Sequence, residues 1–478
     1  MTTTSKPSIA SIIFDIECFR DQSGELYAVS DGRLIEFDPS QIRGLIGSRY
    51  AKKYQEYPPR KDLDTAVDHL LHMAKSAEPR PVYIRSAPVR TPHGMPGVAV
   101  DLSNNESGYM LVTPDSIEYV PGASDRLAWF RRPDSSLALS SALPANLSEL
   151  MPELQRLAPL PDTDSQIARL AFLLSCLWPV GPYPILSLVG PPESGKGFHA
   201  RVIKELVDPS SSTLMGWPSR EEELMLSAIN CRLLVLDNIS WCPPWASNAL
   251  CRLSTGATFQ KRKLYTTRTV VSQEVACPTI VTSVDPALTE PDLISRVTTI
   301  VLPPLPDHGR WDETDALDRV RKDAPFILHR LLQIVQVALL INPSEITQSS
   351  RITPMFRLMT AAEQALNWHP GTFERSYARI RSNGHDAVLG AHSWFEPLLG
   401  IVDANGGDWK GTASELLTAL HRAVPTHLRG PDFPKSATAL SRVLNSIQNS
   451  LMDVGVYIDP NIKRSRMGRV LHIARTRR

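Results

Sequence analysis

The sequence has almost no net charge. Its 478 residues include 51 lysines and arginines and 50 aspartates and glutamates, a formal charge of +1 at pH 7. This balance excludes a uniformly basic coat. Any contact with nucleic acid must therefore come from local basic patches.

Cysteine is scarce, with six residues in the chain. No two of them form a CxxC pair, and no histidine stands at metal-ligand spacing from them. This pattern predicts reduced thiols in a cytoplasm and argues against a zinc site.

The sequence also lacks a signal peptide and an unbroken membrane span. It begins with MTTTSKPS, which is polar and lacks the basic-then-apolar order of a signal peptide. The longest uncharged run, residues 170–189, would cross a bilayer by length, but Pro179, Gly181, Pro182 and Pro184 interrupt it. We expect no membrane partner, and the length predicts about three soluble domains.

The most informative stretch is an apolar run, a glycine loop and an amphipathic helix over residues 186–206. The loop has the pattern GxxxxGK, in which backbone N–H groups and a helix N-terminus face a phosphate and the lysine reaches the outer phosphates. The strand before it and the helix after it argue against an ordinary turn. The residues expected to bind the nucleotide are Gly190, Pro191, Pro192, Glu193, Ser194, Gly195, Lys196, Gly197 and Phe198.

A second apolar run, CRLLVLDNIS, ends in Asp237 and Asn238 about 40 residues after the loop. It is typical of a buried parallel strand with an acid at its carboxyl end. Because the phosphate loop also follows the carboxyl end of a strand, both should meet at one crevice, where Asp237 would hold Mg²⁺. The alternative is an aspartate that caps a turn.

A basic cluster lies on a predicted β-hairpin that turns near residues 266–268 and is followed by a strand over 279–283. Such a cluster is often only a solvated face. Next, PDLISR places Arg296 before another strand, and a helical pattern runs to about 341. The basic residues of the hairpin are Lys261, Arg262, Lys263 and Arg268.

Residues 1–140 predict a small α/β domain, with helices near 41–55 and 63–77. Five strand-like runs follow in a meander: PVYIR, GVAVDL, GYMLVT, SIEYV and RLAWF. FDIEC, residues 14–18, resembles the first exonuclease motif of family B polymerases, but no further carboxylate motifs accompany it, and we expect an amphipathic helix there. Residues 141–162 predict a proline-rich linker around one short helix, and a helix over 164–177 opens the central domain, residues 163–345.

Residues 346–478 predict a helical domain that ends in a winged helix. Trp368, Trp394 and Phe395 are core candidates, and Thr412 with Glu415 has the spacing of a capping box. A helix from about 435 to 451, a strand, a basic loop and a return strand complete the order of a winged helix. The alternative is a solubilising tail. The residues expected to contact DNA here are Arg442, Lys463, Arg464, Arg466 and Arg469.

In this order the motifs resemble those of superfamily 3 helicase-like ATPases of phages, plasmids and integrated mobile elements, in particular the primase-associated ATP-binding proteins. The resemblance covers most of residues 165–305. It rests on PYPILSLVGPPESGKG, LVDPSS, LLVLDNIS, ALCRLSTGATF, LYT and PDLISR.

The resemblance implies an AAA+-like P-loop core that forms hexamers, with ATP and Mg²⁺ as cofactors. Lys196 would contact the β- and γ-phosphates, Asp237 the metal, and Thr282 would occupy the polar sensor position. Arg296, or alternatively Arg252, would reach a neighbouring subunit's nucleotide. The basic hairpin would grip single-stranded DNA.

Three positions depart from the usual motifs. Gly197 lacks the hydroxyl that normally binds Mg²⁺, Asn238 replaces a second acid, and Thr282 replaces asparagine. Glu193, Glu222 or Glu223 could supply a carboxylate for hydrolysis, which depends on these groups more than nucleotide binding does.

The sequence therefore predicts an ATP-dependent DNA helicase or translocase that replicates a phage or mobile element. It would act as a hexameric ring on single-stranded and duplex DNA, with a primase as candidate partner. The alternatives are a nucleotide-binding initiator or loader with weak hydrolysis, and a DNA-binding regulator that uses the ATPase fold as a scaffold.

Overall fold

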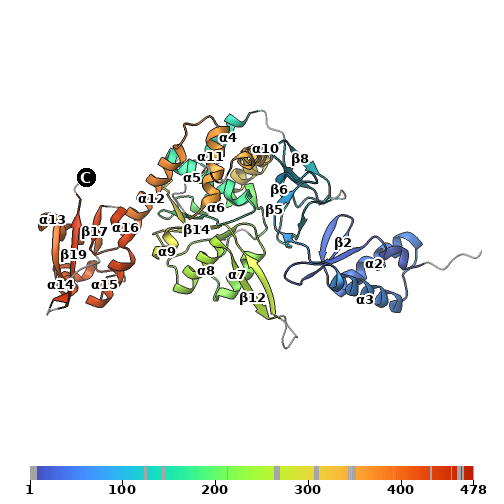
Figure 1. The fold of residues 1–478 in the computed structure, drawn as a ribbon, viewed down its shortest axis with the longest axis horizontal. Coiled ribbons are helices and arrows are strands. Elements are labelled where there is room, and N and C mark those ends of the chain that lie inside the picture. Colours follow the sequence, from blue (N-terminus) through green and yellow to red (C-terminus); the bar gives the residue numbers. More distant parts are fainter. Residues whose placement is uncertain are drawn as a thin grey trace, which may run out of the picture.

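The computed structural model describes residues 8–122, 126–142, 146–212, 214–262, 270–305, 312–342, 344, 346, 351–390, 392–430, 433–453, 455–459, 464–465 and 468–476. Figure 1 shows the chain as a row of parts. The N-terminal unit lies at the right, a central part surrounds a parallel sheet, and the C-terminal unit lies at the left.

The N-terminal unit has its own hydrophobic core. An antiparallel sheet of β1 (Glu17–Arg20), β2 (Leu26–Ser30) and β3 (Arg33–Glu36) packs with α1 (Ala10–Ile13), α2 (Pro39–Tyr54) and α3 (Arg60–Ser76). The two helices expected near 41–55 and 63–77 are confirmed as α2 and α3. Asp38 sets the start of α2, because its carboxylate accepts the N–H groups of Ser40 and Gln41 at 2.9 Å each.

The helix expected over residues 14–18 is wrong. Helix α1 ends at Ile13, and Glu17 already pairs with β2 as the first residue of β1. Strand pairing decides the conformation here rather than the helical spacing of the apolar side chains. Asp15 and Glu17 form ion pairs with Arg49 and Arg80, so both carboxylates serve contacts within the unit.

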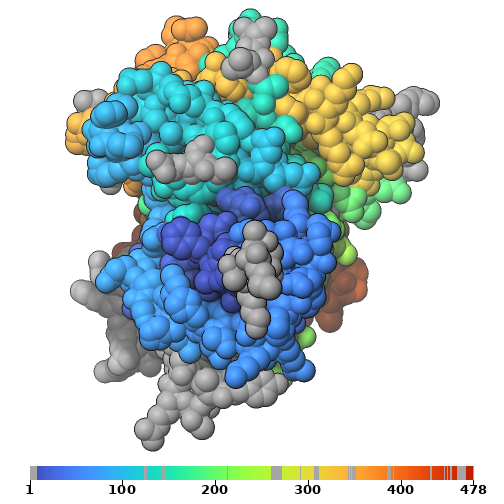
Figure 2. Space-filling model, turned by 90° about the vertical axis from the view of Figure 1, so that its right-hand side faces the viewer, coloured from blue at the N-terminus to red at the C-terminus, as the bar shows by residue number. Residues whose placement is uncertain are grey.

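The strand-like runs that follow are confirmed as β4 (Val82–Tyr83), β6 (Pro96–Asp101), β7 (Tyr109–Val112), β8 (Ile117–Val120) and β9 (Trp129–Phe130). The prediction missed β5 (Ser86–Arg90), which contains a proline at the edge of the sheet β5-β6-β7-β8. One face of this meander, with Val98, Val100 and Val112, belongs to the same core as the central helices. Figure 2 shows the N-terminal unit in blue and the meander in cyan as adjoining regions.

Residues 146–157 form a short 3₁₀-helix and α4 (Leu150–Leu157). Leu150, Leu154 and Leu157 are buried in the central core. Arg330 forms ion pairs with Glu149 and Glu153, which ties this segment to α10 (Glu313–Leu340).

The central sheet is parallel and has the order β11 (Leu234–Leu236), β14 (Thr279–Ser283), β10 (Ile185–Val189), β15 (Val297–Val301). Alternate residues face two cores, as the period of a strand requires. Leu186 and Leu188 join the core that contains α5 (Thr163–Leu177), α6 (Lys196–Val207) and α10. Ile185 and Leu234 face the core formed with α7 (Glu221–Ile229) and α8 (Pro244–Thr255). Helices therefore cover both faces of the sheet (Figure 1).

The predicted hairpin is present as antiparallel β12 (Ala257–Arg262) and β13 (Val270–Val275), while the turn expected at 266–268 lies outside the described residues. The spacing of Ser219 and Glu222 in the sequence predicts a capping box before a helix that runs through Leu226, and this prediction is wrong. Helix α7 begins at Glu221, and it is Glu223 whose carboxylate accepts the N–H of Ser219, at 3.0 Å.

Helix α10 is the one helix among the described residues that is long and apolar enough to cross a membrane. More than half of its most apolar window, 56%, is buried inside the protein, as in a core helix.

Two further helices, α11 (Thr353–Ala365) and α12 (Thr372–Gly390), pack onto the central core through Phe356, Tyr377 and other apolar side chains. The chain beyond them has a separate core that includes Trp394 and Phe395, which confirms these two core predictions. Trp368 is only partly buried, against the central core.

The C-terminal unit contains α13 (Phe395–Ala404), β16 (Asp408–Thr412), α14 (Ala413–Ala423), α15 (Ala437–Ser446), α16 (Gln448–Asp453), β17 (Val456–Ile458), β18 (Arg464–Ser465) and β19 (Gly468–Arg475). The capping box of Thr412 and Glu415 is confirmed. The single helix expected from 435 to 451 is wrong, because the chain leaves helical geometry at Ile447, with φ −100° and ψ 12°. Apolar spacing continues across this break, so the sequence pattern did not reveal it.

Candidate functional site

The loop from Gly190 to Lys196 connects the carboxyl end of β10 to the start of α6. Gly195, at φ +78°, and Glu193, at φ +62°, have left-handed backbone conformations that curl the loop. Helix α6 has no side-chain cap at its N-terminus. Its first backbone N–H groups are therefore available to an anion, and the helix dipole favours negative charge there.

Gly190 is needed for the path of the chain. A Cβ at this position would lie 2.5 Å from the carbonyl oxygen of Leu302 and 2.7 Å from Ser194 Oγ. The N–H of Gly190 donates to the carbonyl oxygen of Ser283 at 3.2 Å, so the loop is also joined to β14.

Lys196 folds back over the loop. Its Nζ donates to the carbonyl oxygens of Gly190 and Pro191 at 2.7 Å each and to Ser194 Oγ at 3.2 Å. Burial lowers the pKa of the Lys196 ammonium, and the nearby Asp237 opposes this shift. An ammonium group beside the uncapped N-terminus of a helix is an arrangement that suits the binding of phosphate.

Asp237 directly follows β11, two strands away from the loop in the same sheet. Thr282 Oγ1 donates to Asp237 Oδ1 at 2.6 Å and accepts the N–H of Asn238 at 2.8 Å. This buried hydroxyl therefore fixes both the carboxylate and the backbone that follows it. The Asn238 side chain is exposed.

Gly197 lies next to this carboxylate. A Cβ at Gly197 would be 3.8 Å from Asp237 Oδ1, and no other atom is that close. The structure thus brings Lys196, Gly197, Asp237, Asn238 and Thr282 together at the carboxyl edge of the sheet.

Mg²⁺ would fit this edge only together with a nucleotide. Among the described residues no group of three or more histidine, cysteine, aspartate or glutamate side chains could hold a metal ion. Mg²⁺ prefers octahedral oxygen ligands and commonly combines one or two carboxylates with phosphates and water. Asp237 and the open space at Gly197 suit that arrangement.

The two predicted arginine fingers lie elsewhere. Arg296 directly precedes β15, and its carbonyl oxygen accepts the N–H of Ile185 at the start of β10, so it lies at the amino edge of the sheet. A five-residue strand spans about 16 Å, which separates Arg296 from the loop of its own chain. Its guanidinium is mostly buried and pairs with Asp292 at 3.0 Å.

Arg252 also lies towards the amino edge. Its neighbours Leu253 and Ser254 accept the N–H groups of Cys277 and Tyr183, which precede β14 and β10. The Arg252 guanidinium forms an ion pair with Glu221.

The predicted DNA contacts are described only in part. Lys261 and Arg262 end strand β12, and Arg442 is exposed on α15. Arg464 and Arg469 occupy paired backbone positions of β18 and β19. Lys263, Arg268, Lys463 and Arg466 lie outside the described residues.

A cavity of about 670 Å³ lies away from the loop, between the meander and α10. Its lining includes Met110, Tyr119 and His329. It shares no residue with the edge that carries Lys196 and Asp237, and it brings no cluster of ionised groups to one point.

No motif in the sequence indicates His199, which is buried one turn after Lys196 beside the buried Arg169. Burial, with a smaller contribution from Arg169, lowers the pKa of His199 to about 3. The unfolded chain, with a pKa near 6.5, therefore takes up the proton first as the pH falls. This contribution to stability is complete above pH 6.5 and is lost as the pH falls towards 3.

We expect the free energy of unfolding to fall by about 2 kcal/mol between pH 7 and pH 5 because of His199 alone. Urea denaturation of the wild type and of His199→Leu at both pH values measures the difference. Equal pH dependence of the two proteins would show that His199 is not the group responsible.

Two family models match the chain. One, for an actinomycete integrative conjugative element replication protein, matches residues 151–368. The other, for the AICE RepA C-terminal domain, matches residues 396–478. Together they cover more than half of the chain, and no curated protein matches it.

The similar solved structures include an SCCmec type IV Cch active helicase, with 12% identity and a TM-score of 0.47 over 96% of this chain and 92% of that chain. The C-terminal region of NrS-1 has 11% identity and a TM-score of 0.42 over 99% of this chain and 100% of that chain. The assignment rests on the two family matches. The chain is a replication protein of a mobile element, and over residues 151–368 and 396–478 it is similar to the replication proteins of actinomycete integrative conjugative elements.

Proposed function

We propose that this protein is an ATP-dependent DNA helicase or translocase of the superfamily 3 type that works in the replication of its mobile element. The observation that carries the proposal is the meeting of Lys196 and Asp237 at one edge of a parallel sheet. Lys196 would bind the β- and γ-phosphates, and Asp237 would hold Mg²⁺ with Thr282 fixing its carboxylate. ATP bound with Mg²⁺ would supply the phosphoanhydride bond whose cleavage, with transfer of the γ-phosphoryl group to water, would drive movement.

A second copy of the chain would complete the site. The candidates Arg296 and Arg252 lie towards the amino edge of the sheet, where they cannot reach the phosphates held by their own chain. Arrangement of subunits in a ring, with six as the expected number, would bring this edge against a neighbour's phosphate loop. Release of Arg296 from Asp292 would accompany that contact.

The basic end of β12, with Lys261 and Arg262, would hold single-stranded DNA, since the hairpin of β12 and β13 projects from the central part (Figure 1). The C-terminal unit would bind duplex DNA as a winged helix. Its order of α13, β16, α14, α15, β17 and β19 and its antiparallel sheet β16-β19-β17 support this. We place the protein in the cytoplasm, where its six free thiols would stay reduced. A primase is the candidate partner.

The test is ATP turnover by the full chain with and without single-stranded DNA, together with its mass in solution when nucleotide is present. We expect an oligomer whose turnover rises several-fold with DNA. Tight ATP binding without turnover would favour an initiator or loader, which the positions Gly197 and Asn238 motivate. Absence of ATP binding would favour a DNA-binding regulator on an ATPase scaffold.

Gly197 allows the missing hydroxyl to be restored. A Cβ there meets no obstacle and stands 3.8 Å from Asp237 Oδ1, so the hydroxyl of Gly197→Ser would lie beside the carboxylate. We expect the Mg²⁺ concentration for half-maximal turnover to fall by about tenfold, because a protein ligand replaces a water. The matched control is Gly197→Ala, and an equal effect in that variant would rule out the hydroxyl as the cause.

A further inference from the structure

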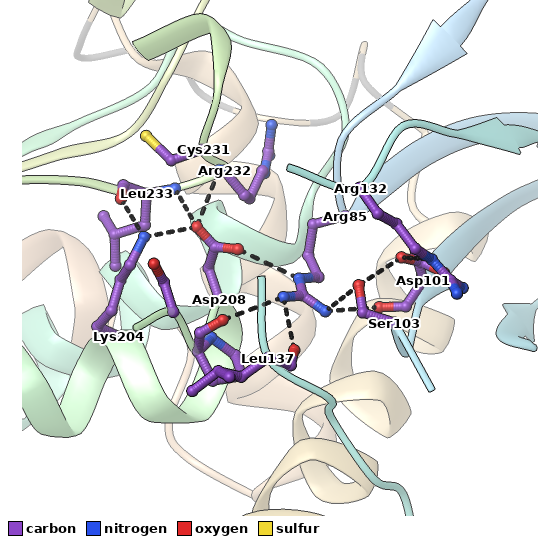
Figure 3. Close-up of polar contacts among 12 residues, drawn as sticks. Arg85, Asp101, Ser103, Arg132, Leu137, Lys204, Asp208, Cys231, Arg232 and Leu233 are labelled. Atoms are coloured by element: carbon purple, nitrogen blue, oxygen red, sulfur yellow. Dashed lines mark hydrogen bonds and ion pairs between the residues drawn. The ribbon is translucent and has the colours of Figure 1, made fainter. Parts of the chain in front are cut away.

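A buried arginine of the N-terminal meander, Arg85, contacts the segment that follows helix α6 of the central part. Arg85 stands between β4 and β5, and its side chain is 2% exposed. Its guanidinium donates to Asp208 Oδ1 at 3.2 Å, and Figure 3 shows this contact at the centre of a wider polar network. The backbone of Arg85 is left-handed, with φ +62°, a costly conformation for a residue with a side chain.

Every donor of this guanidinium is used. Besides Asp208, the acceptors are the carbonyl oxygens of Asp101, Leu137 and Pro209 and the hydroxyl of Ser103. Five bonds match the five N–H groups of an arginine, which no other side chain offers. The five acceptors around Arg85 therefore require an arginine at this position, whereas an ion pair alone would accept any cation.

Asp208 joins two elements of the nucleotide site. It follows the last residue of α6 and accepts the Nζ of Lys204, on the last turn of that helix, at 2.7 Å. The same oxygen accepts the N–H groups of Arg232 and Leu233, just before β11, at 2.9 and 3.0 Å. The end of α6 and the start of β11 are therefore tied to one carboxylate (Figure 3).

The opposite ends of the same two elements carry the proposed chemistry. Helix α6 begins with Lys196, and β11 ends at Leu236, directly before Asp237. Both elements are short and rigid, so a shift where they are tied is transmitted to the other ends. The distance between the lysine and the carboxylate depends on this junction.

The junction depends on two cations. Burial alone would raise the pKa of the Asp208 carboxyl, but Lys204 and Arg85 hold it below its ordinary value. Removing one partner of a buried charged group leaves the other without compensation. Without Arg85, the carboxylate would keep only Lys204 as a charged partner.

We infer that Arg85 is a positioning residue for the nucleotide site, acting through Asp208 on the separation of Lys196 and Asp237. This inference rests on the proposed function. It also makes the meander, which lies outside the family matches, part of the catalytic unit. A misplacement of about 1 Å can reduce turnover by about 100-fold, while the phosphate cradle itself is formed locally within the loop.

The test compares Arg85→Gln with Arg330→Gln. Arg330 is a matched control, because it is equally buried and paired with two carboxylates but joins α10 to Glu149 and Glu153 rather than to α6 or β11. We expect Arg85→Gln to lower kcat by about 10- to 100-fold with ATP affinity changed less than about threefold, and Arg330→Gln to leave kcat near that of the wild type. Arg85→Lys should recover part of the loss, since its ammonium restores the charge beside Asp208.

Hydrogen exchange of residues 196–208 and 229–237 provides a readout independent of activity. Faster exchange in both segments for Arg85→Gln, but not for Arg330→Gln, supports the inference. Equal losses of kcat in the two variants, or unchanged exchange in Arg85→Gln, would overturn it. Should the wild type fail to bind ATP, the proposed function would fail, and the positioning of α6 and β11 would be judged by exchange alone. If Arg85→Gln does not fold, Arg85→Lys is compared with Arg330→Lys by the same criteria.

Discussion

Lys196→Ala is expected to reduce ATP turnover by about 100-fold or more and to weaken ATP binding strongly. The ammonium lies inside the loop, held by the carbonyl oxygens of Gly190 and Pro191 at 2.7 Å each, where phosphate oxygens would bind. Removing a charged donor from such a position costs two to three orders of magnitude in comparable sites. Binding of a fluorescent ATP analogue and steady-state turnover measure the two effects.

The variant should remain folded. Pro191 is exposed, so water can replace the ammonium at its carbonyl oxygen. We expect the thermal unfolding temperature to change little, which separates loss of the site from loss of the fold. Lys410→Ala, which removes an exposed lysine of the C-terminal unit, is the matched control and should keep full turnover. Unaltered ATP binding by Lys196→Ala would contradict the assignment of the loop.

Gly190→Ala is expected to abolish nucleotide binding and to destabilise the fold by about 1–3 kcal/mol. The added Cβ would lie 2.5 Å from the backbone oxygen of Leu302, a distance that real Cβ contacts do not reach, so the loop or the segment after β15 must move. Both effects have one cause, because the loop that would bind phosphate is the part displaced. Chemical denaturation and binding of the ATP analogue measure them.

Gly197→Ala provides the control for Gly190→Ala within the same loop and helix. Its Cβ would meet nothing closer than 3.8 Å, and alanine within a helix is more stable than glycine by about 0.5–1 kcal/mol. This variant should therefore be as stable as the wild type or slightly more so. Equal destabilisation by the two substitutions would show that the loss does not arise from the contact with Leu302.

The buried strands of the central sheet could be predicted from the sequence. The expected strand over 279–283 coincides with β14, because apolar runs bounded by polar residues are sufficient for strands buried on both faces. Strands β1 and β16 could not be predicted in the same way. Strand β16 pairs with β19, which is distant in the sequence, and β1 carries a charged residue at each end instead of a continuous apolar run. Pairing rather than local preference decides the conformation of both strands.

The two capping boxes show the limit of local patterns. Thr412 and Glu415 satisfy both halves of the motif. The N–H of Ser219 donates instead to Glu223, one residue beyond the expected Glu222, and helix α7 begins later than expected, at Glu221. Spacing identifies candidates for a cap, but the path of the preceding chain decides between them.

The candidate site could be predicted only where a local motif exists. Lys196 and Asp237 follow from the glycine loop and from an apolar strand that ends in an acid. Arg85 had no such signal, since its partner Asp208 is 123 residues away and belongs to another segment of the fold. Lys204 and Asp208 do have the spacing of a helical ion pair, the one local hint of this junction.

The core shared by the meander and the central helices has a practical consequence for expression of the protein in pieces. A truncation that starts at residue 151, where the family match begins, would strip Val98, Val100 and Val112 from the helices and leave apolar surface open to aggregation. A cut near residue 80 falls instead between two separate cores. Fragments made for biochemical work should keep the meander.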